Sequence, residues 1–167
     1  MIILETDRLT LRELTFHDSS FILELVNTPG WVTYIGDRNI KNNEQAKEYL
    51  ENGPLESYAQ HQFGLWLVTR KQDGEKLGIC GLLKRDYLDQ PDLGFAFLPE
   101  FTGQGYAQES ANATVAYAQG ELKITGISAL VLAENKRSIH LLEKIGMGLK
   151  KTITVDSASL QLYSIKS

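Results

Sequence analysis

The feature that most constrains the fold is a strand–turn–helix–strand segment in the second half of the chain. Residues 93–98 are apolar and end at a proline, and residues 106–119 form a helical pattern with small side chains on one side. Residues 126–133 are almost continuously apolar, which is typical of a strand buried on both faces. Two strands joined through a helix pair in parallel with a right-handed crossover. This segment therefore predicts an α/β domain.

Further strands and helices are expected on both sides of this segment. The second helix is expected to stop at Gly53-Pro54, and residues 31–38 lack a clean period and are expected to form a loop. We expect one α/β (α+β) domain over residues 1–167, with a mixed central sheet of about seven strands flanked by about four helices. The remaining strands are predicted over residues 8–14, 63–69, 77–83, 149–155 and 159–165, and the remaining helices over residues 18–27, 43–52 and 135–145.

Composition and charge narrow the function classes. The chain has 43% apolar and 23% charged residues, which is an ordinary globular composition. Cys80 is the single cysteine and the three histidines share no ligand spacing, so we expect neither a disulfide nor a metal site. The net charge of −4 argues against nucleic-acid binding. No apolar run suits a signal peptide or a membrane span, so we expect a cytoplasmic protein without a membrane partner.

A glycine-rich turn, Thr102-Gly103-Gln104-Gly105-Tyr106-Ala107, lies between the first strand and the helix of the constraining segment. Glycines let successive backbone N–H groups point into one concavity, and the helix adds its unpaired N–H groups and the positive end of its dipole. Such a turn binds anions, most simply phosphate or diphosphate. The alternative, a tight turn that only caps the helix, stays open. Glu109 in the first helical turn suits the dipole and needs no other role.

Two other phosphate-binding loops do not fit the spacing of this turn. A P-loop requires a lysine directly after its second glycine, and no lysine follows Gly105. A dinucleotide fingerprint, Gly-x-Gly-x-x-Gly, requires a third glycine where this chain has Gln108. The turn alone therefore indicates an anion without identifying it.

Three segments together resemble the GCN5-related N-acetyltransferases (GNAT). Residues 102–107 resemble the acetyl-CoA diphosphate loop of that family, and Asn135-Lys-Arg-Ser138-Ile-His-Leu-Leu142-Glu-Lys-Ile-Gly146-Met147 resembles its next motif. The opening Thr6-Asp-Arg8-Leu-Thr-Leu11-Arg12-Glu-Leu14 resembles the RimJ/RimL-like branch, which acetylates ribosomal-protein N-termini. The three segments follow the family's order and span nearly the whole chain.

Three positions depart from the family pattern. Thr102 stands where the pattern has Gln or Arg, which should cost little because the family's loop acts largely through main-chain N–H groups. Leu142 stands where many members have a tyrosine that protonates the departing thiolate, and Met147 replaces a Phe. The usual general acid is therefore absent.

The resemblance implies a CoA site at the glycine-rich turn. Phe97 and Leu98 would end a strand that parts from its neighbour and would offer main-chain groups to pantetheine and to the thioester carbonyl, an oxyanion-type role. Their side chains are expected to lie in the core. The main-chain N–H groups that would hold the CoA diphosphate belong to Gly103, Gln104, Gly105, Tyr106 and Ala107.

Five further residues have both a functional and a purely structural interpretation, and both stay open. Asn135 contacts the pantetheine arm or caps a helix. Ser138 protonates or orients the CoA sulfur, or is an ordinary serine at a helix start. Asp92 draws a proton from the amine through water, or is a turn aspartate. Trp31 and Tyr34 line the acceptor cleft, or belong to the core.

The resemblance implies an N-acetyltransferase that uses acetyl-CoA and no metal, with direct attack by the amine and no covalent intermediate at Cys80. The favoured acceptor is a protein or peptide N-terminus. The alternatives are a small amine, such as an aminoglycoside or polyamine, and a catalytically silent CoA-binding module. At pH 7 an α-amine with a pKa of ~8 is about 10% neutral, against about 0.04% for a lysine amine. A chain without an unmistakable base therefore favours α-amino acceptors, and the sequence leaves a homodimer open.

Overall fold

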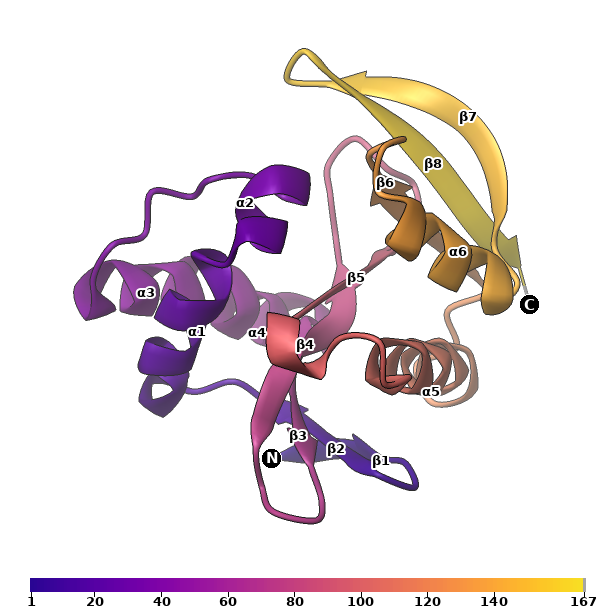
Figure 1. The fold of residues 1–167 in the computed structure, drawn as a ribbon. Helices are drawn as coiled ribbons and strands as arrows, with labels where there is room; N and C mark the ends of the chain where they lie inside the picture. Colours follow the sequence, from indigo (N-terminus) through magenta and orange to yellow (C-terminus); the bar gives the residue numbers. More distant parts are fainter. Residues whose placement is uncertain (167) are drawn as a thin grey trace.

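The strands form one sheet in the order β1-β2-β3-β4-β5-β6-β8-β7 in the computed structural model, which describes residues 1–166 (Figure 1). No helix in this part of the chain is long and apolar enough to cross a membrane. The strands are β1 (Ile2–Glu5), β2 (Leu9–Glu13), β3 (Leu65–Arg70), β4 (Lys76–Leu83), β5 (Asp92–Phe97), β6 (Gly126–Val131), β7 (Gly148–Val155) and β8 (Ala158–Lys166). The α-helices are α1 (Ser19–Val26), α2 (Pro29–Tyr34), α3 (Asn43–Leu50), α4 (Glu56–His61), α5 (Tyr106–Gly120) and α6 (Lys136–Lys144), with shorter helical turns η1 (Phe16–Asp18), η2 (Glu51–Leu55) and η3 (Pro99–Phe101).

The pairing of the strands confirms the expected mixed sheet. Every neighbouring pair is antiparallel except β5 and β6, which are parallel and are joined through α5. The sheet has eight strands rather than about seven, because the sequence did not predict β1. β1 is a four-residue edge strand with exposed ends, and so short a segment carries no readable alternation.

Two parts of the N-terminal helical layer differ from the sequence prediction. α2 occupies part of the loop expected over residues 31–38, because Thr28 accepts a hydrogen bond from the N–H of Trp31 and Pro29 fits the first helical position. The helix expected to stop at Gly53-Pro54 instead continues from α3 through the π turn η2 into α4. The wider turn accommodates the proline ring, which would clash with the preceding turn of a regular α-helix.

Side chains of the central strands alternate between two cores, one on each face of the sheet. In β3, Trp66 and Val68 pack with side chains of α5 and α6, whereas Leu65 and Leu67 pack with side chains of α1 and α3. Figure 1 shows the same division, with α1 to α4 gathered on one side of the sheet and α5 and α6 on the other. This alternation keeps β3 buried on both faces.

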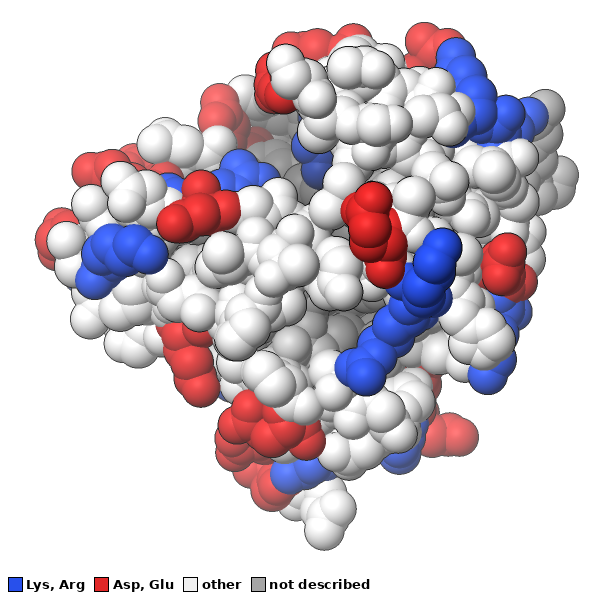
Figure 2. Space-filling model, turned by 45° about the horizontal axis from the view of Figure 1, so that its top comes forward, with Lys and Arg blue, Asp and Glu red and all other residues white. Residues whose placement is uncertain are grey.

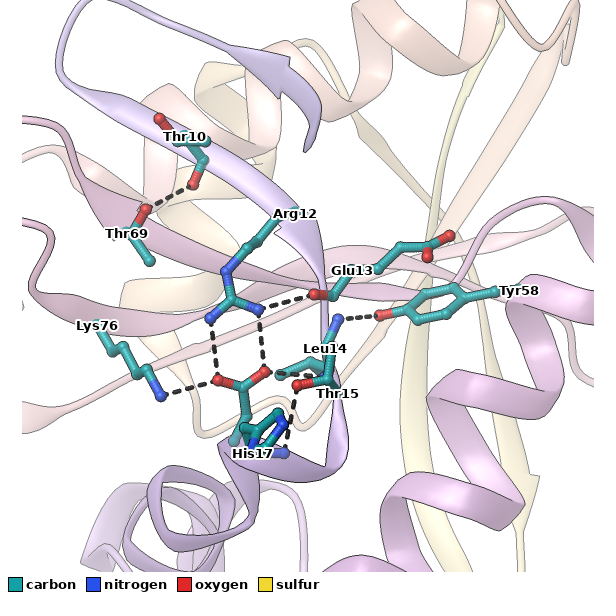
Figure 3. Close-up of polar contacts among 10 residues, drawn as sticks. Thr10, Arg12, Glu13, Leu14, Thr15, His17, Tyr58, Thr69 and Lys76 are labelled. Atoms are coloured by element: carbon teal, nitrogen blue, oxygen red, sulfur yellow. Dashed lines mark hydrogen bonds and ion pairs between the residues drawn. The ribbon is translucent and has the colours of Figure 1, made fainter. Parts of the chain in front are cut away.

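A buried carboxylate joins the first helical turns to the sheet (Figure 3). Asp18 is only 1% exposed and accepts hydrogen bonds from both terminal nitrogens of Arg12 at 3.0 Å, from Lys76 Nζ at 2.8 Å and from the N–H of Thr15 at 2.8 Å. Burial acts to raise the pKa of Asp18, but these hydrogen bonds outweigh it and lower this pKa to about 2. The α1 end of the helical layer is therefore fixed to both β2 and β4.

Candidate active site

The parallel strands β5 and β6 pair at a single position and then part. Their pairing is confined to Asp92 and Ser128, near the start of β5. At the other end of β5, the N–H of Leu98 donates to the carbonyl of Leu77 in β4 at 2.9 Å. Since consecutive residues of a strand direct their main-chain groups to opposite sides, those of Phe97 point toward the β6 side. The structure thus contains the opening that the family resemblance implied.

Of the two residues expected to face this opening, only Phe97 has a free main chain on that side. The N–H of Leu98 is used by β4, and its carbonyl accepts from the N–H of Phe101 at 3.0 Å. The expectation that Leu98 also offers main-chain groups to a ligand is therefore corrected, because both its N–H and its carbonyl are already hydrogen-bonded. The Leu98 side chain is 4% exposed and the Phe97 ring packs against the core, as expected for both.

The glycine-rich turn presents a row of unpaired backbone donors. Gly103 and Gly105 have φ values of +78° and +86°, a left-handed conformation that favours glycine, and Gly105 is the N-cap of α5. Within residues 1–166, the N–H groups of residues 103–108 have no hydrogen-bond acceptor. Among the described residues, no side chain caps the helix start. Free N–H groups at the positive end of a fifteen-residue helix are suited to binding an anion.

Side chains of the turn are directed back toward the chain that precedes it. The Thr102 hydroxyl donates to the carbonyl of Pro99 at 2.8 Å, and the Gln104 side-chain amide donates to the carbonyl of Glu100 at 3.0 Å. Thr102, which departs from the family pattern, therefore has a local structural role. The main-chain N–H groups stay unobstructed by these side chains, so the turn fits a bound diphosphate.

The start of α6 lies across the opening from α5 in Figure 1. The side-chain oxygen of Asn135 accepts from the N–H of Ser138 at 3.3 Å, so Asn135 caps this helix. The Ser138 side chain is half-buried, and its hydroxyl has no hydrogen-bond partner in residues 1–166. Leu142, at the family's tyrosine position, is 1% exposed and packs in the core, so its side chain supplies no acid. Contacts of Asn135 or Ser138 with CoA stay predictions.

Asp92 is a buried carboxylate in the sheet rather than a turn aspartate. It is the first residue of β5, is 2% exposed, and accepts from Arg85 Nε at 3.0 Å. Burial raises the pKa of Asp92 to about 6, although the Arg85 guanidinium acts to lower it. A carboxylate with this pKa is mostly ionised at pH 7 and can still be protonated, which suits a proton acceptor.

A groove lies near the point where β5 and β6 pair, although Asp92 itself does not line it. It has a volume of about 810 Å³ and lies between residues 87–90 and the strands β7 and β8. Ser128, the pairing partner of Asp92, lies in its wall. Figure 2 shows another view of the surface, with a hollow near the middle and with acidic and basic side chains both beside this hollow and around the margin. The groove provides room for a ligand and reaches Ser128, the residue that pairs with Asp92 in the sheet.

The two aromatic residues expected at the acceptor cleft have different environments. Trp31 is 4% exposed and packs in the core of the helical layer, so it is a core residue rather than a cleft residue. Tyr34, at the end of α2, is 40% exposed. Its ring is therefore available to a ligand, and its contact with an acceptor stays a prediction.

Sequence reasoning missed two arginines at the site. Arg85 pairs with Asp92, and Arg8 contacts the glycine-rich turn and Glu109 in the first turn of α5. Arg8 and Glu109 are 101 residues apart, and such a pair leaves no local periodicity to detect. The family resemblance pointed to the segment around Arg8 but assigned no role to its side chain.

Comparison with known proteins identifies the family. A model of the acetyltransferase (GNAT) domain matches residues 8–148. The chain is 33% identical over 167 residues to YkkB of Bacillus subtilis, covering 98% of this chain and 95% of YkkB. It is 26% identical over 140 residues to the spermidine N(1)-acetyltransferase of Vibrio cholerae, covering 83% of this chain and 78% of that enzyme.

A solved structure extends this likeness to the fold. RimL, a ribosomal L7/L12 α-N-protein acetyltransferase in complex with coenzyme A, superposes with a TM-score of 0.86 at 14% identity, covering 99% of this chain and 98% of RimL. At this identity the likeness concerns the fold, so the RimJ/RimL-like branch is not established. The family model covers most of the chain and includes the unpaired donors of residues 103–108. The chain therefore belongs to the GNAT acetyltransferase family and is an N-acetyltransferase.

Proposed function

We propose that this protein transfers an acetyl group from acetyl-CoA to the α-amino group of a protein or peptide N-terminus, by direct attack of the amine. The observation that carries the proposal is the row of unpaired N–H groups over residues 103–108, at the start of α5 and beside the parted strands. Such donors bind a diphosphate without needing a basic side chain.

The residues around the opening have distinct binding roles in this proposal. The N–H groups of residues 103–107 hold the diphosphate, and the main chain of Phe97 pairs with the pantetheine arm. Asn135 also borders the arm, since its side-chain amide N–H groups are not used in capping α6. When bound, acetyl-CoA supplies a thioester carbonyl for attack and a thiol as the leaving group.

Proton transfer falls to Asp92 and Ser138. The Asp92 carboxylate, held by Arg85 and paired in the sheet with Ser128 of the groove wall, accepts the amine proton through a water molecule. As the C–N bond forms and the C–S bond breaks, the Ser138 hydroxyl donates a hydrogen bond to the departing sulfur, and the thiolate takes its proton from solvent. Cys80 has no part, because it is fully buried and burial raises the pKa of its thiol to about 11.

An α-amino acceptor suits this site better than a lysine side chain. An α-amine with a pKa of ~8 is about 10% neutral at pH 7, whereas a lysine amine is about 0.04% neutral. A carboxylate with a pKa of about 6 is a weak base and favours the amine that loses its proton more easily.

A small polyamine is the second candidate acceptor, because a relative at 26% identity is a spermidine N(1)-acetyltransferase. Mass spectrometry separates the two candidates by counting acetyl groups. The substrates are a set of peptides with free N-termini, the same peptides blocked at the N-terminus but containing lysine, and spermidine with an aminoglycoside.

The proposal expects acetylation of the free-N-terminus peptides and none of the blocked ones. Acetylated spermidine or aminoglycoside with untouched peptides would overturn the choice of acceptor. Tight CoA binding without turnover on any amine would indicate a catalytically silent CoA-binding module. This outcome is included because Leu142, at the family's tyrosine position, is buried in the core and supplies no acid.

A further inference from the structure

A charged clamp joins the start of the chain to the first turn of α5. Arg8 Nε donates to Glu109 Oε1 at 2.8 Å, and the main-chain N–H of Arg8 donates to Glu109 Oε2 at 3.1 Å. The Thr6 hydroxyl also donates to Glu109 Oε2. Residues outside the helix therefore bond both oxygens of this carboxylate. The sequence analysis had assigned Glu109 only an interaction with the helix dipole and did not predict these bonds.

The same guanidinium contacts the glycine-rich turn. Arg8 Nη1 donates to the carbonyl of Gln104 at 3.1 Å, and the guanidinium carbon lies 4.4 Å from the centre of the Tyr106 ring. Arg8 Nη2 lies 3.2 Å from the position that a Cβ on Gly105 would occupy. One side chain thus contacts Gln104 and Tyr106 and leaves no free space for a side chain at Gly105 between them.

The bond to Gln104 determines where the next N–H group points. In a trans peptide unit, the carbonyl of one residue and the N–H of the next point in opposite directions. With the Gln104 carbonyl directed at Arg8, the N–H of Gly105 is directed away from Arg8 and remains unpaired. The contact keeps a donor of the anion site available.

The bonds from Arg8 to Glu109 offset the repulsion between the Glu109 carboxylate and an anion bound at the turn. The N–H of Glu109 donates to the carbonyl of Gly105, so this residue lies one turn from the start of α5. A carboxylate there stabilises a bare helix but repels a bound anion. Burial acts to raise the pKa of Glu109, but hydrogen bonds from Thr6 and Arg8 outweigh it and lower this pKa, so the carboxylate stays charged and needs a cation beside it.

We propose that Arg8 is a positioning residue for the CoA diphosphate, which rests on the proposed function. Its guanidinium cancels the charge of Glu109 and orients the peptide unit between Gln104 and Gly105, so that the turn accepts an anion. Arg8 acts through these groups and not through contact with the reacting atoms.

Calorimetric titration with CoA tests this role without relying on turnover. Arg8→Met keeps the aliphatic stem and removes the cation, and we expect it to weaken CoA binding roughly tenfold, equivalent to about 1.4 kcal/mol. The KM for acetyl-CoA should rise by the same factor with kcat changed less than twofold. Lys71→Met is the matched control, because it removes one cation at the same end of the sheet from an exposed pair with Glu5. It should leave the affinity within twofold of the wild type.

The double variant Arg8→Met/Glu109→Gln tests the repulsion between Glu109 and the bound anion, and we expect it to recover at least threefold of the lost affinity.

The choice of ligand tests which phosphate is affected. Arg8→Met should lower the affinity for CoA and for 3′-dephospho-CoA by the same factor. If Arg8→Met does not fold, Arg8→Lys replaces it, with a loss of about threefold expected because an ammonium cannot hold both partners in the fork geometry.

Unchanged affinity in Arg8→Met, no recovery in the double variant, or a loss confined to CoA with its 3′-phosphate would overturn the proposal. These failures are distinct from failure of the proposed function, in which the wild-type protein itself would not bind CoA.

Discussion

Replacing Asp18 by asparagine removes the charge around which β2, β4 and the first helical turns are joined (Figure 3). The carboxylate accepts from Arg12, Lys76 and Thr15, and it is 1% exposed. An asparagine keeps one acceptor oxygen and turns an NH₂ group toward two cations. The variant should therefore lose the ion pairs without creating a cavity.

The pKa of Asp18 gives the size of the effect. It lies at about 2 instead of 3.8, and at 1.36 kcal/mol for each pKa unit this corresponds to about 2 kcal/mol of folding stability at neutral pH. Because the pKa is lowered in the folded state, this stability is present above pH 3.8 and is lost as the pH falls toward 2. Breaking a buried pair also leaves its cations unpaired, so Asp18→Asn should cost about 2–4 kcal/mol.

Urea unfolding followed by tryptophan fluorescence measures this cost at pH 7 and pH 3. The free energy of unfolding of Asp18→Asn should lie below the wild type by about 2–4 kcal/mol at pH 7, and the gap should narrow at pH 3. Asp37→Asn is the control, because Asp37 pairs with Lys41 at 3.8 Å with both side chains 55% exposed, and it should cost less than about 0.5 kcal/mol. A loss below about 0.5 kcal/mol in Asp18→Asn, or a loss that does not change with pH, would refute this reasoning.

Three further predictions concern the site. Gly105→Ala places a side chain at a residue with φ of +86° and close to Arg8, which costs about 1–2 kcal/mol of strain. Calorimetry should therefore show CoA affinity lowered roughly tenfold, and an unchanged affinity would contradict diphosphate binding by the glycine-rich turn. Asp92 must lose its proton to act as a base, so kcat/KM should rise with pH through about 6 and this limb should vanish in Asp92→Asn; a limb that persists there removes Asp92 from the mechanism. Cys80→Ala should keep wild-type kcat, because the thiol is buried and protonated, and trapping of an acetylated Cys80 by mass spectrometry would disprove direct attack.

The parts of the fold that follow from local patterns were predictable from the sequence. The strand–helix–strand unit was predicted because continuous apolar runs, a helical period and a glycine-rich turn each occupy neighbouring residues. The turn at residues 102–107 was found for the same reason, since glycine at Gly103 and Gly105 reports a left-handed backbone that few other residues adopt.

Features that depend on tertiary context were not predictable. The dipeptide Thr28-Pro29 is compatible both with the end of one helix and with the start of the next. Only the packing of the following helix decides between these two structures. The strong burial of Asp92 depends on neighbours from several strands, and the contact of Arg8 with Glu109 joins residues that lie 101 positions apart in the sequence. Side chains that meet only after folding leave no period in the sequence.

Amide spectra of the ¹⁵N-labelled protein during a titration with CoA test the central claim most directly, because they report on each backbone N–H group separately. The resonances of Gly103, Gly105 and their neighbours up to residue 108 should shift strongly with CoA and stay unchanged with pantetheine, which lacks the diphosphate. Saturating CoA that leaves these resonances in place would contradict the account, since the unpaired donors at the start of α5 would then hold nothing.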